Sequence, residues 1–296
     1  MDCLEEPSDI ENFESDKDEC LLDEATLEKC PIQLIPISSL RPTQISVGMQ
    51  QVKEKQKKIQ GKKLKDKPQK RDKFLRRVWH RIPVVKGPAN STCSSSMSAS
   101  ESLGADNASS EHAFYMVDHH HLGLALLNSG IEDAYVAVIE DLTSLNLHQF
   151  WERMNQTGRV WSCDEKVYIL RGAVMSLWSC DEKGMSLTLD EFKDKIPRTI
   201  TDLRDDPFRS LSALLRKAGG YMKSRVPYTE FIWANYLRQQ SILECVKSCA
   251  ADDPLQLSGP HLAAALQVAS ALSVEEASQL QLPGVVMTPH PSLIKQ

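Results

Sequence analysis

Apolar and polar residues alternate along four short stretches of the chain, each bounded by polar residues, glycine or proline. These stretches span residues 32–37, 82–86, 113–117 and 134–139. A period of two is typical of a β-strand with one buried face, and Pro36 in the first stretch is tolerated on an edge strand. The pattern therefore predicts four strands that form a small mixed sheet.

Other stretches repeat their apolar residues at the spacing of a helix. In the first of them, Met49, Val52 and Ile59 form one stripe. Helices are predicted over residues 48–59, 120–128, 145–154, 206–217, 228–250 and 261–272. Because strands and helices mix in the first half while helices alone follow residue 200, the predicted fold class is α+β with a helical C-terminal extension.

Charge is distributed unevenly along the 296 residues, which carry a net charge of −5. Residues 1–30 hold twelve acids and two lysines, about −10, whereas residues 53–77 hold thirteen Lys/Arg and three acids, about +10. We expect the acidic tail to be disordered because it is too charged to form a core. The basic segment is expected to contact nucleic-acid phosphates, to act as a nuclear import signal, or to be a solvated linker. Its candidate phosphate contacts are Lys62, Lys63, Lys70 and Arg71.

Shifts in composition divide the chain into four regions. We expect an acidic tail (1–30), a sheet-containing core (31–151) with the basic segment and a Ser-rich insertion (88–111), a linker region (152–200) and a helical region (201–296). The linker contains the hexapeptide Trp-Ser-Cys-Asp-Glu-Lys twice, at 161–166 and 178–183. Two copies do not make a solenoid, and we assign them no function.

Several protein classes are disfavoured by the sequence. No stretch approaches the roughly 18 consecutive apolar residues of a membrane span, and the acidic N-terminus is unlike a secretory signal. We therefore expect an intracellular protein, nuclear or cytoplasmic, without a membrane partner. The eight cysteines include no Cys-x-x-Cys pair, so neither a disulfide framework nor a zinc knuckle is supported.

The sequence Asp118-His119-His120-His121 lies between a predicted strand and a predicted helix. The first N–H groups of a helix are unpaired, so such a turn can bind an anion such as phosphate. The imidazoles would add donors or acid–base groups, and Asp118 is a candidate cap, general base or metal ligand. Successive helical side chains diverge by about 100°, so three histidines cannot all address one ion. A merely capped and solvated turn is the alternative without function.

A second candidate group begins the helix predicted near residue 206. Asp206 followed by proline is typical of a helix start. If the chain brings this helix to the histidine turn, Arg209 would bind phosphate and Asp205 would be a second carboxylate for Mg²⁺. Glu230 and Trp233, one turn apart, are expected to be a salt-bridging acid and a core aromatic residue.

Several motifs, taken in order, resemble the ParB-like nuclease family of the ParB/sulfiredoxin fold. They are Leu40-Arg-Pro-Thr-Gln44 with Val47-Gly-Met49, Ile82-Pro-Val-Val85, Tyr115-Met-Val-Asp-His-His-His-Leu122, Leu203-Arg-Asp-Asp-Pro-Phe-Arg-Ser-Leu211, Arg216-Lys-Ala-Gly-Gly-Tyr221, Glu230-Phe-Ile-Trp-Ala234 and Leu282-Pro-Gly284. The resemblance spans about residues 32–286. It implies phosphate binding at the histidine turn, and it adds Arg41 and Gln44 as phosphate-binding candidates.

The histidine turn departs from other members of the superfamily. Partition proteins carry Gly-Glu-Arg-Arg there and sulfiredoxin carries Gly-Gly-Cys-His, so the chemistry of neither is transferred. We expect phosphodiester hydrolysis or nucleotide-dependent phosphoryl chemistry, with His119, His120 and His121 as acid–base groups or phosphate donors. Asp118 would act as general base or as ligand of Mg²⁺ or another divalent cation, and a nucleotide or nucleic acid would be the ligand. The alternative is a nucleotide- or DNA-binding module without turnover.

Overall fold

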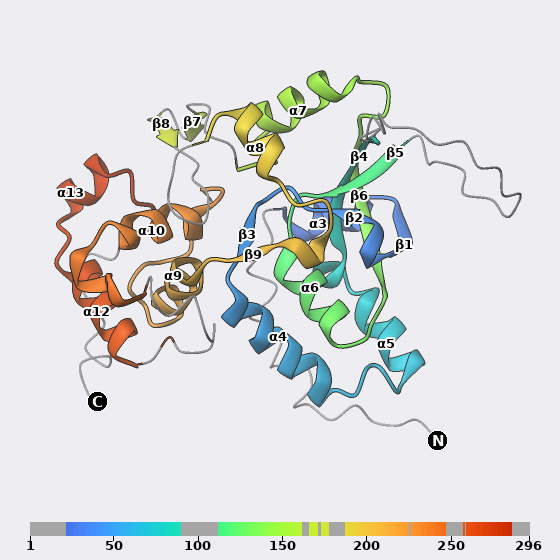
Figure 1. Ribbon diagram of the computed structural model, residues 1–296, viewed down its shortest axis with the longest axis horizontal. Helices are drawn as coiled ribbons and strands as arrows, with labels where there is room; N and C mark the ends of the chain where they lie inside the picture. Colours follow the sequence, from blue (N-terminus) through green and yellow to red (C-terminus); the bar gives the residue numbers. More distant parts are fainter. Residues whose placement is uncertain are drawn as a thin grey trace, which may run out of the picture.

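The computed structural model describes residues 22–89, 112–161, 166–170, 173–177, 187–224, 226–246, 257 and 259–285. Its main feature is a five-stranded sheet in the order β1-β6-β4-β5-β2 (Figure 1). The strands are β1 (Ile32–Pro36), β2 (Leu40–Arg41), β4 (Ile82–Pro88), β5 (His112–Met116) and β6 (Asp133–Asp141). Four of them are the strands expected from the alternation of apolar residues, and the α+β fold class is confirmed.

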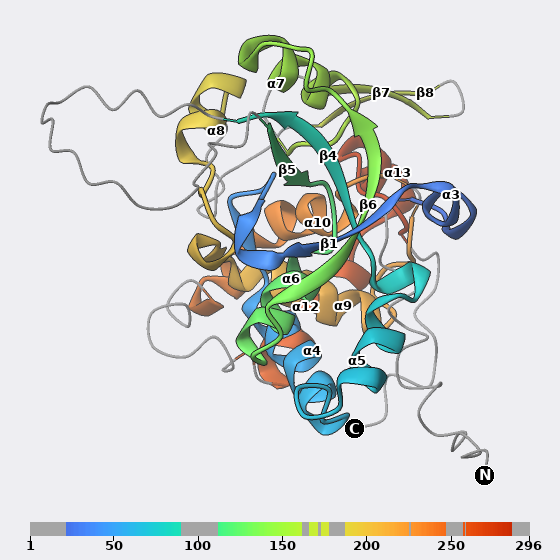
Figure 2. The same ribbon diagram turned by 90° about the vertical axis from the view of Figure 1, so that its right-hand side faces the viewer.

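The sheet is mixed and curved. Strand β6 pairs antiparallel with β1 and parallel with β4, while β5 pairs antiparallel with β4 and parallel with β2. The register between β4 and β6 shifts between Val84 and Val85. An irregularity of this kind bends a strand, and Figure 2 shows β4 and β6 curving together along the sheet.

Helices cover both faces of the sheet and form a separate group beyond it. The α-helices described are α3 (Glu24–Lys29), α4 (Met49–Gly61), α5 (Pro68–Leu75), α6 (His120–Asn128), α7 (Leu147–Gln156), α8 (Leu189–Lys195), α9 (Pro207–Lys217), α10 (Thr229–Arg238), α12 (Gly259–Ser270) and α13 (Val274–Gln279). The 3₁₀-helices are η1 (Ile37–Ser39), η2 (Val78–His80), η3 (Ile200–Asp202) and η4 (Ser241–Leu243). The helix predicted over residues 228–250 is shorter in the structure: α10 ends at Arg238, and the 3₁₀-helix η4 follows it.

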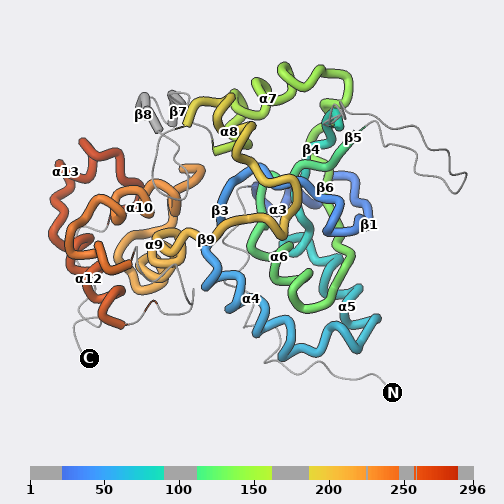
Figure 3. Tube along the Cα trace, in the orientation of Figure 1, coloured from blue at the N-terminus to red at the C-terminus, as the bar shows by residue number. Residues whose placement is uncertain are grey.

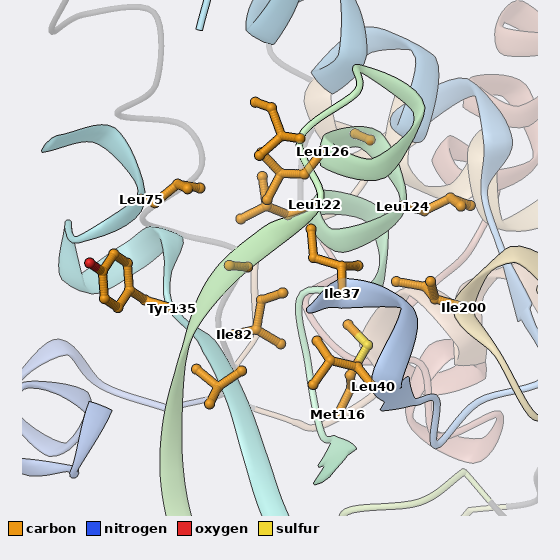
Figure 4. Packing of buried hydrophobic residues seen from close by; sticks show 14 of the residues in the cluster. Ile37, Leu40, Leu75, Ile82, Met116, Leu122, Leu124, Leu126, Tyr135 and Ile200 are labelled. Atoms are coloured by element: carbon orange, nitrogen blue, oxygen red, sulfur yellow. The ribbon is translucent and has the colours of Figure 1, made fainter. Parts of the chain in front are cut away.

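Alternate residues of the strands face two different hydrophobic clusters, as the period-two pattern predicts. Val84 and Met116 pack with the apolar residues of α4, α5 and α6. Their neighbours Val85 and Tyr115 pack instead with α7 and α8 on the opposite face. Figure 4 shows the leucines of α6 lying over the first of these faces.

The C-terminal helices α9, α10, α12 and α13 have a hydrophobic cluster of their own, centred on the fully buried Trp233. Figure 3 shows this group beside the sheet and its helices. A two-stranded parallel pair connects the two parts. It is formed by β3 (Ser46–Val47) and β9 (Arg204–Asp205), and it brings the start of α4 against the start of α9.

The charged segments contain more structure than the sequence suggested. Residues 24–29 of the predicted disordered tail form α3, whose Leu27 is 1% exposed; residues 1–21 lie outside the described chain. The basic segment forms the end of α4 and all of α5, and it buries Leu64 and Phe74. It is therefore part of the core rather than only a solvated linker.

Two other predicted features fall largely outside the described residues. Of the Ser-rich insertion, only residues 88 and 89 are described. Of the two hexapeptides, only Trp161 and Lys166 are described. The strand β7 (Lys166–Leu170) begins at the last residue of the first copy, and it pairs antiparallel with β8 (Ala173–Leu177), which ends before the second copy.

Candidate functional site

A cavity of about 610 Å³ lies where the sheet region meets the C-terminal helices. Its wall comes from the start of α3, the first turns of α4, η2, the histidine turn, α9, and the segment that leads into α10. The residues that carry the argument below are Gln44, Asp118, His119, His121, Arg209 and Glu230. A volume of this size is typical of sites for small molecules.

The histidine turn joins β5 to α6, as the sequence predicted. The N–H of His119 donates to Asp118 Oδ1 at 2.6 Å. His119 has φ 63°, in the left-handed region, and it precedes the first residue of α6. The N-cap residue His119 makes no side-chain hydrogen bond to the start of this helix. Strain at a non-glycine residue is typical of functional sites, and the N-terminus of a helix suits an anion.

His120 and His121 accept hydrogen bonds from the backbone of a distant loop. The N–H of Thr43 donates to His120 Nε2, and the N–H of Gly48 donates to His121 Nε2, both at 3.1 Å. Burial and the positive charge of Arg209 lower the pKa of both imidazoles well below 6.5. Both histidines are therefore neutral, and their Nε2 atoms are acceptors rather than donors to a phosphate. Their geometry favours a role in the fold over the predicted role in chemistry.

His119 differs from its two neighbours. Its Nδ1 lies 2.9 Å from the carbonyl oxygen of Arg81. A carbonyl oxygen only accepts, so Nδ1 carries a proton, and in the neutral imidazole the lone pair is then on Nε2. His119 and His121 line the cavity, whereas His120 does not, and Nε2 of His121 already accepts from Gly48. Of the three predicted histidines, His119 has the arrangement that suits a general base.

Arg209 is the most deeply buried of the four Lys and Arg residues that line the cavity in the described chain; Lys55 is also buried. Arg209 is 4% exposed, and its Nη1 donates to Gln44 Oε1 and to the carbonyl oxygen of Ser46, both at 2.9 Å. The guanidinium lies 3.6 Å from the ring centroid of Phe231, while Nε makes no hydrogen bond to a described residue. Burial lowers the pKa of Arg209, whereas the negative charges of Glu230, Asp206 and Asp118 raise it. The guanidinium stays charged and retains donors for an anion.

Two ion pairs link helix α9, which carries Arg209, to helix α10. Asp206 caps α9 as predicted, accepting from the N–H groups of Phe208 and Arg209. Its other oxygen lies 2.7 Å from Arg238 Nη2 in a buried pair. Across the cavity, Glu230 lies 3.1 Å from Arg216, so its predicted salt bridge is present, as is the buried Trp233.

Asp205 does not join the histidine turn. Its Oδ1 accepts from the N–H of Met49 at 2.9 Å, at the start of α4, and it does not line the cavity. Burial raises the pKa of this carboxyl to about 6. The expectation of Asp205 as a second carboxylate for Mg²⁺ is thus not supported. No group of three or more His, Cys, Asp or Glu among the described residues is arranged to hold a metal ion.

The other predicted site residues divide into two groups. Gln44 lines the cavity, and its Oε1 accepts from Arg209; phosphate binding by Gln44 stays a prediction. Arg41 does not line the cavity; its guanidinium lies 6.0 Å from the ring centroid of Tyr115. The basic-segment residues also lie outside its wall: Lys62, Lys63, Lys70 and Arg71.

Several cavity residues were not found from the sequence. They include Lys55, Trp79, Arg216, Lys223 and Tyr228. Tyr228 precedes α10 with φ 59°, so a second strained residue faces the same space. No role at a site was predicted for these residues from the sequence, although Lys55 belongs to the basic segment and Arg216 begins one of the motifs of the family resemblance. None of the helices in the described part of the chain has the length and apolar character needed to cross a membrane.

Comparisons with known proteins give a matching family model and similar solved structures. A family model described as "Putative ParB-like nuclease" matches residues 33–177 and 173–239. The chain has no match among curated proteins. The crystal structure of protein Atu1540 from Agrobacterium tumefaciens is similar, with a TM-score of 0.56 and 29% identity, over 87% of this chain and 99% of that one. Because the family model matches more than half of the chain, the protein belongs to the ParB-like nuclease family.

Proposed function

We propose that the cavity binds a phosphate ester, as a nucleotide or as part of a nucleic acid, and that the histidine turn hydrolyses it. The observation that carries the proposal is the placement of Arg209. A buried guanidinium with unused donors lines the same cavity as Asp118 and His119. Buried charges are costly unless paired, so a second, anionic partner is a physical reason for this residue to be there.

His119 and Asp118 supply the chemistry in this proposal. The lone pair on His119 Nε2 takes a proton from a water molecule, whose oxygen attacks phosphorus while the ester P–O bond breaks. The leaving oxygen then takes up the proton from His119, directly or through water, and departs as an alcohol. Arg209 and the N-terminus of α6 stabilise the negative charge on the phosphate oxygens. The carboxylate of Asp118 accepts a hydrogen bond from the N–H of His119 and thereby stabilises the left-handed backbone of the turn.

Metal binding by Asp118 remains a prediction. The described residues offer no set of three ligands, so a cation at this carboxylate would take its other ligands from water and from phosphate oxygens. Mg²⁺ is commonly bound in this way. The steps assigned to His119 and Arg209 do not depend on it.

Binding without turnover is the second candidate function. It is favoured by His120 and His121, which serve as hydrogen-bond acceptors for the backbone and leave one imidazole for chemistry. In that case the cavity would bind a nucleotide or nucleic acid and release it unchanged.

The test combines binding and turnover in matched variants. Thermal unfolding with nucleotides, with and without Mg²⁺ or Mn²⁺, measures binding, and nuclease and phosphate-release assays measure turnover. Asparagine tolerates the left-handed backbone at position 119. The variant His119→Asn should therefore still bind nucleotide, but its turnover should fall by about 100-fold or more. Arg209→Lys should weaken binding. The control is His148→Gln, at an exposed histidine outside the cavity. Full turnover in His119→Asn would place the reaction elsewhere, and binding without turnover in the wild type would select the second candidate.

A further inference from the structure

The start of helix α3 forms part of the cavity wall, although it belongs to the acidic N-terminal segment. Asp23 and Glu24 line the cavity together with four cations of the described chain. These cations are Lys55, Arg209, Arg216 and Lys223. The acidic segment therefore meets the cavity that we propose to bind an anion, and Lys55 of the basic segment lines the same cavity.

The charges of the wall show what α3 contributes. The described lining residues include four carboxylates and four Lys or Arg side chains, so the wall is formally balanced when the histidines are neutral. Two of these carboxylates are Asp23 and Glu24. Without them the wall would carry an excess of two positive charges, which would favour an anionic ligand.

The attachment of α3 is limited. The helix has six residues and buries one side chain, that of Leu27. Isolated helices of this length are unstable in water, so α3 depends on its packing against the protein. Asp23 caps the helix by accepting from the N–H of Thr26 at 2.8 Å, and Glu24 makes no ion pair with a described residue. The position of the Glu24 carboxylate is thus set by the docking of the helix.

We infer that α3 is an intramolecular competitor for the anion that binds in the cavity. In the structure its N-cap Asp23 and its first residue Glu24 line the cavity, and an anionic ligand binds more tightly once α3 has moved away. Leu27 is the anchor that holds α3 in the competing position. The inference rests on the proposed function, because it assumes that the ligand of the cavity is an anion.

The test measures pyrophosphate binding to the full chain by titration calorimetry at low ionic strength. The double variant Asp23→Asn, Glu24→Gln removes both charges, and Leu27→Gln releases the helix while adding no charge. Both should bind pyrophosphate about fivefold to tenfold more tightly than the wild type, and the difference should shrink as salt is added. Glu28→Gln is the matched control, since it removes one charge from the same helix at a residue that does not line the cavity.

A second measurement follows α3 itself. Amide hydrogen exchange over residues 24–29 of the wild type should become faster when pyrophosphate is added, because the bound anion displaces the helix. Equal pyrophosphate affinity in all variants, or unchanged exchange at saturating pyrophosphate, would overturn the competitor role and leave the anion site intact. No pyrophosphate binding in any variant would overturn both the competitor role and the proposed anion site.

Discussion

The Nε2 atom of His121 accepts a hydrogen bond from the backbone N–H of Gly48, 73 residues earlier in the chain. The next two N–H groups of α4 donate to Asp205 and Ser210, from the start of α9. Three remote side chains therefore satisfy the beginning of a helix that has no cap of its own. The start of α4 is fixed between the histidine turn and α9, so its N–H groups are not available to a ligand.

The buried histidines should make the protein less stable in mild acid. Burial lowers the pKa of His120 and His121 well below 6.5, and that of His80 to about 3. Below about pH 6.5 the unfolded chain protonates these residues while the folded protein does not. The unfolded state then binds more protons, so the free energy of unfolding falls as the pH drops, by about 1.4 kcal/mol per pH unit for each histidine.

Urea unfolding between about pH 7 and about pH 5 measures this slope. Asp205, with its pKa raised to about 6, acts in the opposite direction below that pH but is outnumbered. His121→Gln keeps an acceptor for Gly48 and should reduce the slope, whereas His148→Gln at an exposed residue should not. Equal free energies of unfolding at both pH values would show that His80, His120 and His121 are not held neutral in the folded protein.

Two glycines of α4 should respond oppositely to alanine. A Cβ at Gly48 would lie 2.5 Å from Gln51 Oε1 and 3.0 Å from the backbone nitrogen of Ser210, whereas one at Gly61 would have no atom within 4 Å. Gly48→Ala should cost about 1–3 kcal/mol because the contact with α9 must open. Gly61→Ala should be neutral or stabilise by up to about 1 kcal/mol. Thermal and urea unfolding compare the two, and a harmless Gly48→Ala would contradict the close packing of α4 on α9.

The buried ion pair at the start of α9 should matter more than an exposed one. Arg238 and Asp206 are 7% and 5% exposed, whereas Arg76 and Asp72 are 54% and 50% exposed. Arg238→Ala leaves the Asp206 carboxylate buried without its partner, and we expect a loss of about 3–5 kcal/mol in urea unfolding. Arg76→Ala should change stability little, because water replaces its partner. Similar losses for both variants would contradict the burial of the first pair.

The basic segment should bind nucleic acid independently of the cavity. Reversing the charge of Lys62, Lys63, Lys70 and Arg71 should weaken nucleic-acid binding and lower the slope of log affinity against log salt, by up to about 3–4 if all four contact phosphates. Pyrophosphate binding in the cavity should not change, since none of these residues lines it. Reversal of Lys193 and Lys195 on α8 is the control. Unchanged nucleic-acid affinity would leave the segment as a structural element or import signal.

Local patterns in the sequence were sufficient for the strands, for the start of α6 and for the Asp206 cap of α9. Each of these features depends on residues that are close in the chain: alternation in β5, a turn after Met116, a carboxylate followed by proline. Arg209 was a site candidate only on the condition that its helix reaches the histidine turn, and Gln44 was added by the family resemblance. Local patterns could not bring them together, because 165 residues separate the two side chains.

The roles of the three histidines could not be read from the sequence, where they are equivalent neighbours. In the structure the Nε2 atoms of His120 and His121 accept from the N–H groups of Thr43 and Gly48. Nδ1 of His119 faces the carbonyl oxygen of Arg81, and His119 and His121 both line the cavity. The sequence also placed α3 in a featureless acidic tail, since one buried leucine gives no periodicity. The sequence by itself thus determined the elements and the chemical groups, and the tertiary structure decided which groups face the cavity, because burial and hydrogen-bond partners arise only when distant segments pack together.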